Sequence, residues 1–120
     1  MQRCPCDSGE SYEDCCRPLH RGECEAPTAL ALMRSRYAAF AQGDAAYLRR
    51  TWHVSTRPRS LELDADRVWT GLEIVATEAG GPFETSGVVE FRAHHRTGVQ
   101  SERSTFTREG GRWYYLSGSV

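Results

Sequence analysis

Four of the five cysteines of this chain lie within its first 16 residues, as two closely spaced pairs: Cys4 with Cys6, and Cys15 with Cys16. Zinc takes four ligands in a tetrahedron and binds thiolate sulfur readily, so the two pairs can close a structural site. Between the pairs, Gly9 permits the positive φ of a loop that doubles back, and the Ser8 hydroxyl can hydrogen-bond a coordinating sulfur. The spacing therefore predicts a compact zinc-binding segment, called the knuckle below.

Other uses of these thiols compete with a zinc site. Disulfide pairing is disfavoured because Cys15 and Cys16 are adjacent, the cysteine total is odd and no secretory signal precedes the cluster. Ligation of an iron–sulfur cluster is a minor alternative. His20 and Cys24 follow closely, and either could replace one ligand, Cys16 above all, if neighbouring residues cannot both turn inward. Labile thiolates would also suit a redox or zinc sensor.

The cysteine run, Cys-Pro-Cys-x-Ser-Gly-x-x-Tyr-x-x-Cys-Cys, resembles the SEC-C zinc motif, named for the C-terminus of the translocation ATPase SecA, in which the last ligand is usually histidine. The Cys-Cys ending and several segments spread along the chain resemble the small bacterial YchJ family; these segments are Leu32–Phe40, Thr51–His53, Trp69–Ile74, Val89–Phe91 and Trp113–Tyr115. The resemblance implies an α+β protein with a zinc knuckle at residues 1–25. At residues 26–120 it implies a cone similar to nuclear transport factor 2, with helices packed on a curved antiparallel sheet. It implies no particular activity.

Composition and charge limit the classes of partner that this protein is expected to have. The chain has 120 residues, a formal net charge of −1 and no apolar run that could span a membrane, which is typical of one cytoplasmic domain. All 15 basic residues are arginine, which fits a GC-rich coding bias and carries little weight for nucleic-acid binding. Residues 1–25 hold three arginines against six acids, so the knuckle should repel phosphate and favour a basic or mixed partner surface. A merely solvated acidic segment is the alternative.

Hydrophobic periodicity predicts helices first and strands afterwards. Residues 26–28, Ala-Pro-Thr, are expected to form a linker and the start of a first helix, which runs to about Gln42 with Gly43 as its C-terminal cap. Asp44 caps a shorter second helix that runs toward Trp52. Apolar stripes on two sides of the first helix indicate burial on both. Residues 57–68 are expected to form a surface loop or a short helix. From Trp69 onward, apolar residues recur at every second position, and strands are expected at 70–78, 87–96, 100–109 and 112–118.

Two-residue hairpin turns are expected between the last three strands, at Thr97–Gly98 and Gly110–Gly111. With these turns, Phe91 lies opposite Ser104, and Glu102 shares the apolar face of the sheet. A slip of one residue would turn Glu90 inward instead, so one of these two glutamates is expected in the interior of the cone. A carboxylate in that position needs a partner or a proton.

Two interpretations of that interior compete. In the first, His53, Glu102 and Glu90 supply acid–base chemistry to a small ligand, as similar folds do in enzymes. In the second, an ion pair between an arginine and a glutamate holds helix against sheet, and His53 is a core or capping histidine. The expected pocket residues are Arg34, Arg36, Tyr37, Trp52, His53, Trp69, Glu102 and Tyr115.

These residues favour a zinc-binding cytoplasmic protein, with the cone as a scaffold or as a pocket for a small ligand. The resemblance to SEC-C motifs implies that the knuckle contacts a protein or a ribosome. A small enzyme that uses His53 and a buried glutamate is one alternative, and sensing through the cysteine cluster is another. The acidic knuckle argues against direct nucleic-acid binding. The oligomeric state does not follow from the sequence.

Overall fold

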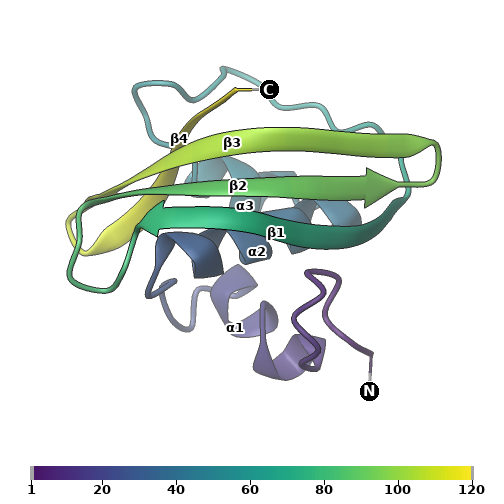
Figure 1. The fold of residues 1–120 in the computed structure, drawn as a ribbon, viewed down its shortest axis with the longest axis horizontal. Coiled ribbons are helices and arrows are strands. Elements are labelled where there is room, and N and C mark those ends of the chain that lie inside the picture. The colour runs from purple at the N-terminus through teal and green to yellow at the C-terminus, as the bar shows by residue number, and fades with distance from the viewer. Residues whose placement is uncertain (1, 120) are drawn as a thin grey trace.

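The computed structural model describes residues 2–119 as helices packed against one face of a curved, four-stranded antiparallel sheet (Figure 1). The strands lie side by side in chain order: β1 (Trp69–Ala79), β2 (Ser86–His95), β3 (Gly98–Glu109) and β4 (Arg112–Ser119). The helical elements precede them: η1 (Tyr12–Asp14), α1 (Arg17–His20), α2 (Ala29–Gln42) and α3 (Ala45–Arg50). This is the α+β cone that the sequence predicts.

Capping residues set the ends of the two helices that build the cone. Thr28 accepts a hydrogen bond from a main-chain amide of the first turn at 3.0 Å and starts α2, and Gly43 ends it with a φ of 73°. Asp44 starts α3 in the same way, also at 3.0 Å. The expected ends of α2 are confirmed, whereas α3 stops at Arg50, a little before the predicted end.

α2 is the central helix, and several elements cover it. The sheet lies on one side of it, and α3 and α1 pack on others. Leu32, Met33 and Tyr37 are accordingly buried. Burial on two sides, expected from the two apolar stripes, is confirmed. One charged residue, Arg36, is buried among them and is only 4% exposed.

The turn between β3 and β4 has the predicted register. Gly110 and Gly111 both take a positive φ, of 59° and 80°, and the flanking residues Glu109 and Arg112 pair directly. Two successive positive φ angles make a turn whose twist matches that of the strands, and glycine adopts them without strain.

The turn between β2 and β3 lies one residue earlier than predicted. His95 pairs with Gly98, because Gly98 adopts a strand conformation instead of the positive φ of a glycine turn. Phe91 therefore lies opposite Glu102, and the predicted pairing with Ser104 is wrong. The pairing has shifted by an even number of residues, so every side chain keeps the face that was expected for it. Glu102 therefore faces the helices.

The chain between α3 and β1 closes one end of the cone. Residues 57–68 contain no helix or strand, so the loop alternative is confirmed. Leu61 and Leu63 are partly buried against the core, and the Arg49 side chain donates to the Pro58 carbonyl at 3.3 Å. The loop is thus tied to α3 at its start and to the core in its middle.

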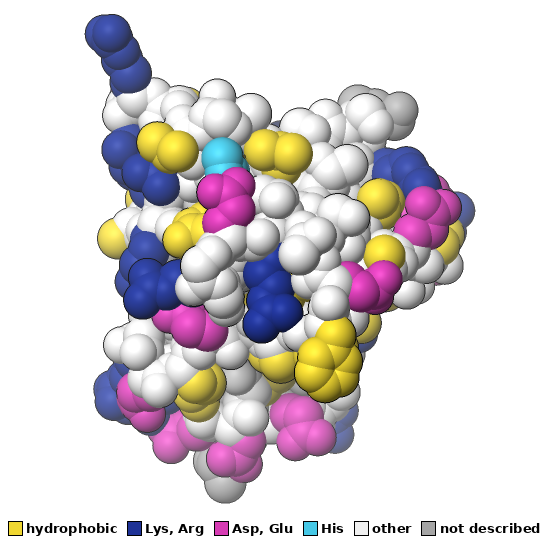
Figure 2. All heavy atoms as spheres, turned by 90° about the vertical axis from the view of Figure 1, so that its left-hand side faces the viewer, with side chains coloured by type: hydrophobic (Ala, Val, Ile, Leu, Met, Phe, Trp, Pro, Cys, Tyr) yellow, Lys and Arg dark blue, Asp and Glu magenta, His cyan; other side chains and the backbone are white. Residues whose placement is uncertain are grey.

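The surface at the end of the sheet that carries the β1–β2 and β3–β4 turns is mixed in character. Figure 2 shows acidic, basic and apolar side chains interspersed over this face, without a broad area of one kind. Large exposed apolar residues occur, such as Phe83 at 95% exposure and Val54 at 74%. Among residues 2–119, no helix has the length and apolarity that crossing a membrane requires.

Gly87 lies where the β1–β2 hairpin meets the start of α2. A Cβ atom added there would lie 2.6 Å from the Gly80 Cα atom and 3.0 Å from the Ala29 Cβ atom. We expect Gly87→Ala to lower the free energy of unfolding by about 1–3 kcal/mol, measured by urea denaturation, because backbone has to move. Gly98→Ala is the control, since its closest neighbour is a His95 side-chain atom at 3.4 Å. Equal losses in the two variants would contradict this packing.

Candidate metal centre and cone cavity

The four N-terminal cysteines of the knuckle converge. Their Sγ atoms all lie within 4.8 Å of one another, with 3.6 Å between Cys6 and Cys15 and 3.9 Å between Cys15 and Cys16. A tetrahedral zinc ion with sulfur ligands at about 2.3 Å requires neighbouring sulfur atoms about 3.8 Å apart. All five cysteines of the chain are free thiols, so no disulfide competes for them. The cluster therefore has the dimensions of a metal site.

Burial and mutual contacts between the sulfur atoms change the ionisation of the thiols in the cluster. Cys4, Cys6 and Cys16 are buried. Hydrogen bonds with the Cys4 and Cys6 sulfur atoms, together with burial, raise the pKa of the Cys16 thiol above its usual range. A bound divalent cation would reverse this effect, because it stabilises the thiolates that it binds. The Ser8 hydroxyl lies 3.2 Å from the Cys15 sulfur, where it can support that ligand.

His20 and Cys24 are not members of the sulfur cluster. His20 Nε2 lies 2.8 Å from the Ser35 carbonyl oxygen, which only accepts, so Nε2 carries the proton. Its Nδ1 then accepts from the Tyr12 hydroxyl, also at 2.8 Å. Both ring nitrogens are thus engaged between knuckle and α2, and Cys24 is exposed to solvent. The residues brought together are the four expected ligands: Cys4, Cys6, Cys15 and Cys16.

Hydrogen bonds fasten the knuckle to the cone. The Asp7 carboxylate accepts from the main-chain amide of Leu72 in β1 at 3.3 Å. Arg34 of α2 donates to the Cys6 carbonyl at 2.8 Å. Gly9, which follows both anchors, takes a φ of 90° and lets the loop double back so that Ser11 pairs with Arg3. A metal ion in the knuckle would therefore stabilise the contact with α2 and β1 as well as the knuckle itself.

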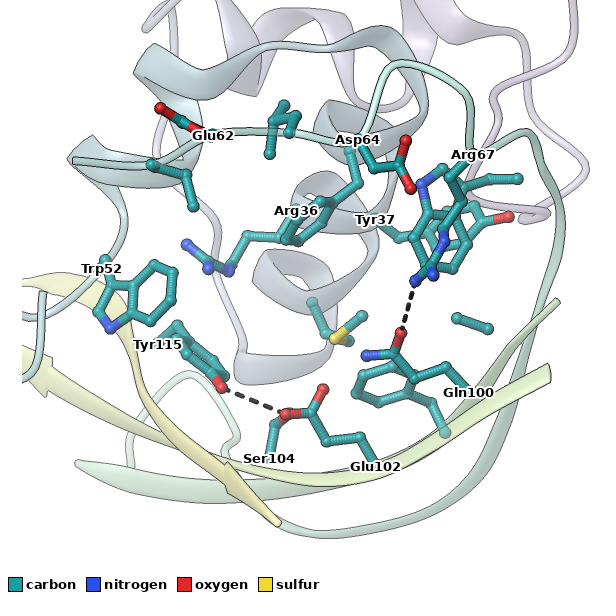
Figure 3. A pocket seen from close by; sticks show the side chains of 17 residues that line it. Arg36, Tyr37, Trp52, Glu62, Asp64, Arg67, Gln100, Glu102, Ser104 and Tyr115 are labelled. Atoms are coloured by element: carbon teal, nitrogen blue, oxygen red, sulfur yellow. Dashed lines mark hydrogen bonds between the residues drawn. The ribbon is translucent and has the colours of Figure 1, made fainter. Parts of the chain in front are cut away.

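A cavity of about 360 Å³ lies between α2, the sheet and the 57–68 loop. Figure 3 shows its aromatic walls and the charged side chains that project toward it. The exposed loop residues Glu62, Asp64 and Arg67 form its outer edge, and buried residues of α2 and the sheet form its floor. Six of the eight expected pocket residues line it: Arg36, Tyr37, Trp52, Trp69, Glu102 and Tyr115.

Arg36 is the charged group in the floor of this cavity. Its guanidinium carbon lies 4.5 Å from the ring centre of Tyr115 and 5.2 Å from that of Trp52, so aromatic faces hold it in place. Its Nη1 donates to the Leu48 carbonyl at 2.8 Å and to the Thr51 hydroxyl at 2.7 Å. Burial lowers the pKa of Arg36 to about 10, so the side chain stays charged at neutral pH.

Glu102 rather than Glu90 faces the cavity. The Tyr115 hydroxyl donates to Glu102 Oε1 at 3.3 Å (Figure 3). Burial raises the pKa of Glu102, and the Tyr115 hydrogen bond and the Arg36 charge oppose that rise. Glu90 lies on the opposite face of the sheet, 3.4 Å from Nη1 of Arg103. The sequence left this choice open, and the strand register decides it.

His53 and Arg34 do not line the cavity, which corrects the expected set of pocket residues. The His53 amide donates to the Tyr115 carbonyl at 2.8 Å, and its ring points to the surface, where Nε2 lies 2.6 Å from Glu109 Oε2. Arg34 is turned toward the knuckle. The cavity therefore brings Glu102 together with Arg36, and the expected acid–base pair of His53 with a buried glutamate is not assembled.

The raised pKa of Glu102 predicts a pH-dependent effect on stability. Because burial disfavours the charged carboxylate in the folded state, wild-type protein loses stability as the pH rises from the unfolded-state pKa through the folded-state value. We expect Glu102→Gln to unfold at a higher temperature than wild type at pH 8, with a smaller difference at pH 5. Thermal unfolding of both proteins across this range measures it. A difference in unfolding temperature that increases as the pH is lowered would contradict this prediction, because it would show that the folded protein stabilises Glu102 as the carboxylate.

The cavity wall contains residues that sequence reasoning did not identify. The 57–68 loop supplies several of them, and β3 supplies another: Leu61, Glu62, Leu63, Asp64, Arg67 and Gln100. The alternation of leucine with acidic residues at 61–64 was the available signal, since it places Leu61 and Leu63 on one side of an extended segment.

Fold and site together define a small α+β protein in which a four-cysteine knuckle is docked on a cone with an internal cavity. Residues 28–118 match the family described as YchJ, middle NTF2-like domain. The chain belongs to this YchJ family, whose curated relatives are named UPF0225 proteins. It is 57% identical to a UPF0225 protein of Streptomyces coelicolor, over 96% of this chain and 93% of that protein. It is 51% identical to one of Chromobacterium violaceum, over 98% and 92%.

Two solved structures share the whole arrangement. A SEC-C motif containing protein from Rhodopseudomonas palustris is 34% identical, with a TM-score of 0.83 over 99% of this chain and 98% of that one. A SEC-C motif containing protein from Psychrobacter arcticus is 30% identical, with a TM-score of 0.79 over 98% and 81%. Both similarities extend over the knuckle as well as the cone, which supports the resemblance of the cysteine run to a SEC-C motif.

Proposed function

We propose that this chain is a zinc-binding protein whose knuckle docks on a basic protein surface, either a single protein or a protein component of the ribosome. The cone serves as the rigid body that carries the knuckle. The observation that carries the zinc assignment is the convergence of four cysteine sulfur atoms within 4.8 Å. Cys4, Cys6, Cys15 and Cys16 would hold the ion, and its role would be structural.

The donor set supports zinc in a structural role. Four thiolates complete a tetrahedral shell, so a bound ion has no open position for substrate or water. Three of the four sulfur-bearing residues are buried, which limits exchange of the ion with solvent. The knuckle is also too small to have an apolar core of its own, and a metal ion commonly replaces such a core in short segments.

The charge of the knuckle supports a basic partner. All six acidic residues of this segment are exposed: Asp7, Glu10, Glu13, Asp14, Glu23 and Glu25. In Figure 2, acidic side chains gather at the lower end of the molecule, where Figure 1 places the N-terminal segment and α1. Four thiolates on one divalent ion would add further negative charge. This surface repels phosphate and attracts arginine-rich or lysine-rich protein surfaces.

Metal content tests the first half of the proposal. Elemental analysis of protein purified in reducing buffer without added metal should find about one zinc per chain. Iron with a visible absorption band would instead indicate an iron–sulfur cluster. Freshly reduced protein that contains no metal would refute the assignment.

Cosedimentation with purified bacterial ribosomes, at increasing salt, tests the partner. We expect zinc-loaded protein to sediment with ribosomes and to lose binding in the Glu10→Lys/Glu23→Lys variant. Asp66→Lys/Glu84→Lys, which makes the same change in charge at two exposed acids outside the knuckle, is the matched control and should bind like wild type. Binding to free ribosomal RNA, or equal losses in both variants, would contradict docking of the acidic knuckle on a protein surface.

A further inference from the structure

The cone cavity contains a buried cation, Arg36, that makes no ion pair within hydrogen-bonding distance. The arginine ion pairs among residues 2–119 are made by Arg17, Arg92, Arg103 and Arg112, all outside the cavity. Arg36 is 4% exposed, and its hydrogen bonds to protein all leave from Nη1. Its other two nitrogen atoms, Nε and Nη2, remain available as donors. Folded proteins rarely bury a charge without a partner, because desolvation is costly.

A second buried polar group in the same cavity also lacks a partner. The Ser104 hydroxyl is buried, the residue being 1% exposed, and it makes no hydrogen bond within the part of the chain that the structure describes. Ser104 comes from β3 and Arg36 from α2, so the two groups lie on opposing walls of the cavity. An unmade buried hydrogen bond costs free energy that a ligand in the cavity can recover.

The two free nitrogen donors of Arg36 indicate which kind of anion the cavity can bind. Nε and Nη2 lie on one edge of the planar guanidinium, and two parallel N–H groups match the two oxygens of a carboxylate. A phosphate dianion fits less well because the cavity has no excess of positive charge. Its charged lining is Arg36 and Arg67 against Glu62, Asp64 and Glu102. A monoanion is therefore favoured over a dianion.

The aromatic side chains that line the cavity indicate the shape of the rest of the ligand. Aromatic side chains line the cavity on several sides: Tyr37, Phe40, Trp52, Trp69, Phe91 and Tyr115. Aromatic walls of this kind favour a flat ring that packs edge-to-face or offset against them. The volume of about 360 Å³ falls within the range of small-ligand sites.

We propose that the cone cavity binds a small planar carboxylic acid, whose carboxylate lies against Arg36 and whose far end carries a polar group that reaches Ser104 and Glu102. This inference does not depend on the proposed zinc site or its partner. The ligand would supply the direct ion pair that Arg36 lacks and the hydrogen bond that Ser104 lacks. Glu102, held by Tyr115, would favour a hydroxyl or amino donor at the far end over a second carboxylate.

Titration of zinc-loaded wild-type protein with a small set of probes, followed by ¹H–¹⁵N NMR, tests this directly. The probes are benzoate, 4-hydroxybenzoate and indole-3-carboxylate, with phenol and phenyl phosphate as comparisons. We expect the aromatic carboxylates to bind with a Kd of about 1 mM or tighter and to shift the Ser104 and Glu102 amides. Phenol, which lacks the anion, should bind at least about tenfold more weakly.

Two variants assign the contacts. Arg36→Met keeps an unbranched apolar stem but removes the guanidinium, and should weaken 4-hydroxybenzoate binding by about tenfold or more. Ser104→Ala should weaken 4-hydroxybenzoate binding by about threefold to tenfold. This second variant provides the test if Arg36→Met does not fold. Arg103→Met, on the other face of the sheet, is the control and should bind like wild type. Zinc content is measured in every sample, so loss of the knuckle is distinguished from loss of the cavity.

Several outcomes would overturn the proposal. Absence of binding by all three aromatic carboxylates in folded wild-type protein would refute the ligand class. Equal affinity for phenol and 4-hydroxybenzoate would refute the role of the anion, and tighter binding of phenyl phosphate would refute the choice of a monoanion. Binding unchanged by both Arg36→Met and Ser104→Ala would place the ligand elsewhere.

Discussion

Cys6→Ser is expected to abolish metal binding and to unfold the knuckle. Cys6 is 0% exposed, its sulfur lies 3.6 Å from that of Cys15, and its carbonyl accepts a hydrogen bond from Arg34. Serine supplies no thiolate, so bound zinc should fall from about one per chain to near zero. The free energy of unfolding should fall by about 4 kcal/mol or more, which lowers Tm by about 15 °C. Elemental analysis and thermal unfolding measure the two effects.

The matched control makes the same atomic change outside the cluster. Cys24 is exposed, so Cys24→Ser should retain zinc and unfold at the wild-type temperature. Wild type treated with a strong chelator should reproduce the lower Tm of Cys6→Ser, because removing the ion and removing a ligand have the same consequence for the knuckle. Zinc retained by Cys6→Ser at wild-type stoichiometry would exclude the four-cysteine site.

Phe106→Ala is expected to have the second large effect, on the cone. Phe106 is 2% exposed and is among the largest fully buried side chains. Its ring packs edge-on against Tyr115 at 5.9 Å between ring centres. Truncation removes this contact and leaves a void between α2 and the sheet, so we expect a loss of about 3–5 kcal/mol in the free energy of unfolding. Urea denaturation at constant zinc measures the loss.

Phe83→Ala is the control for this prediction. Phe83 is 95% exposed in the turn between β1 and β2, and it loses almost no buried area on truncation. Its free energy of unfolding should stay within about 0.5 kcal/mol of wild type. Similar losses for the two phenylalanines would contradict the inward face that the strand register assigns to Phe106.

Much of the fold could be predicted because its signals are local. The Thr28 and Asp44 caps, the glycine after α2 and the alternating strands each depend on residues close together in the chain. The turn between β2 and β3 was placed one residue too late, because Gly98 is equally compatible with a turn and with a strand end. The faces of the strands were nevertheless correct, since an even shift leaves side-chain alternation unchanged.

The metal ligands were easier to predict than the cavity residues. All four cysteines lie within one short segment, so their spacing alone constrains how the sulfur atoms can meet. The cavity is built by α2, the strands and the 57–68 loop, which come together only in the folded chain. His53 was expected inside as an acid–base partner of a buried glutamate. Its ring instead meets Glu109 at the surface, through a main-chain hydrogen bond to β4 that sequence does not reveal.

The four-cysteine cluster and the order of helices and strands could be predicted from the sequence, because these features depend on short-range spacing and periodicity. Three other features became visible only in the folded chain: Glu102 rather than Glu90 shares a cavity with Arg36, Arg36 makes no ion pair there, and the knuckle is fastened to α2 and β1. These features depend on which distant segments pack together. That is set by the strand register and by the docking of α2 on the sheet, which no local pattern specifies.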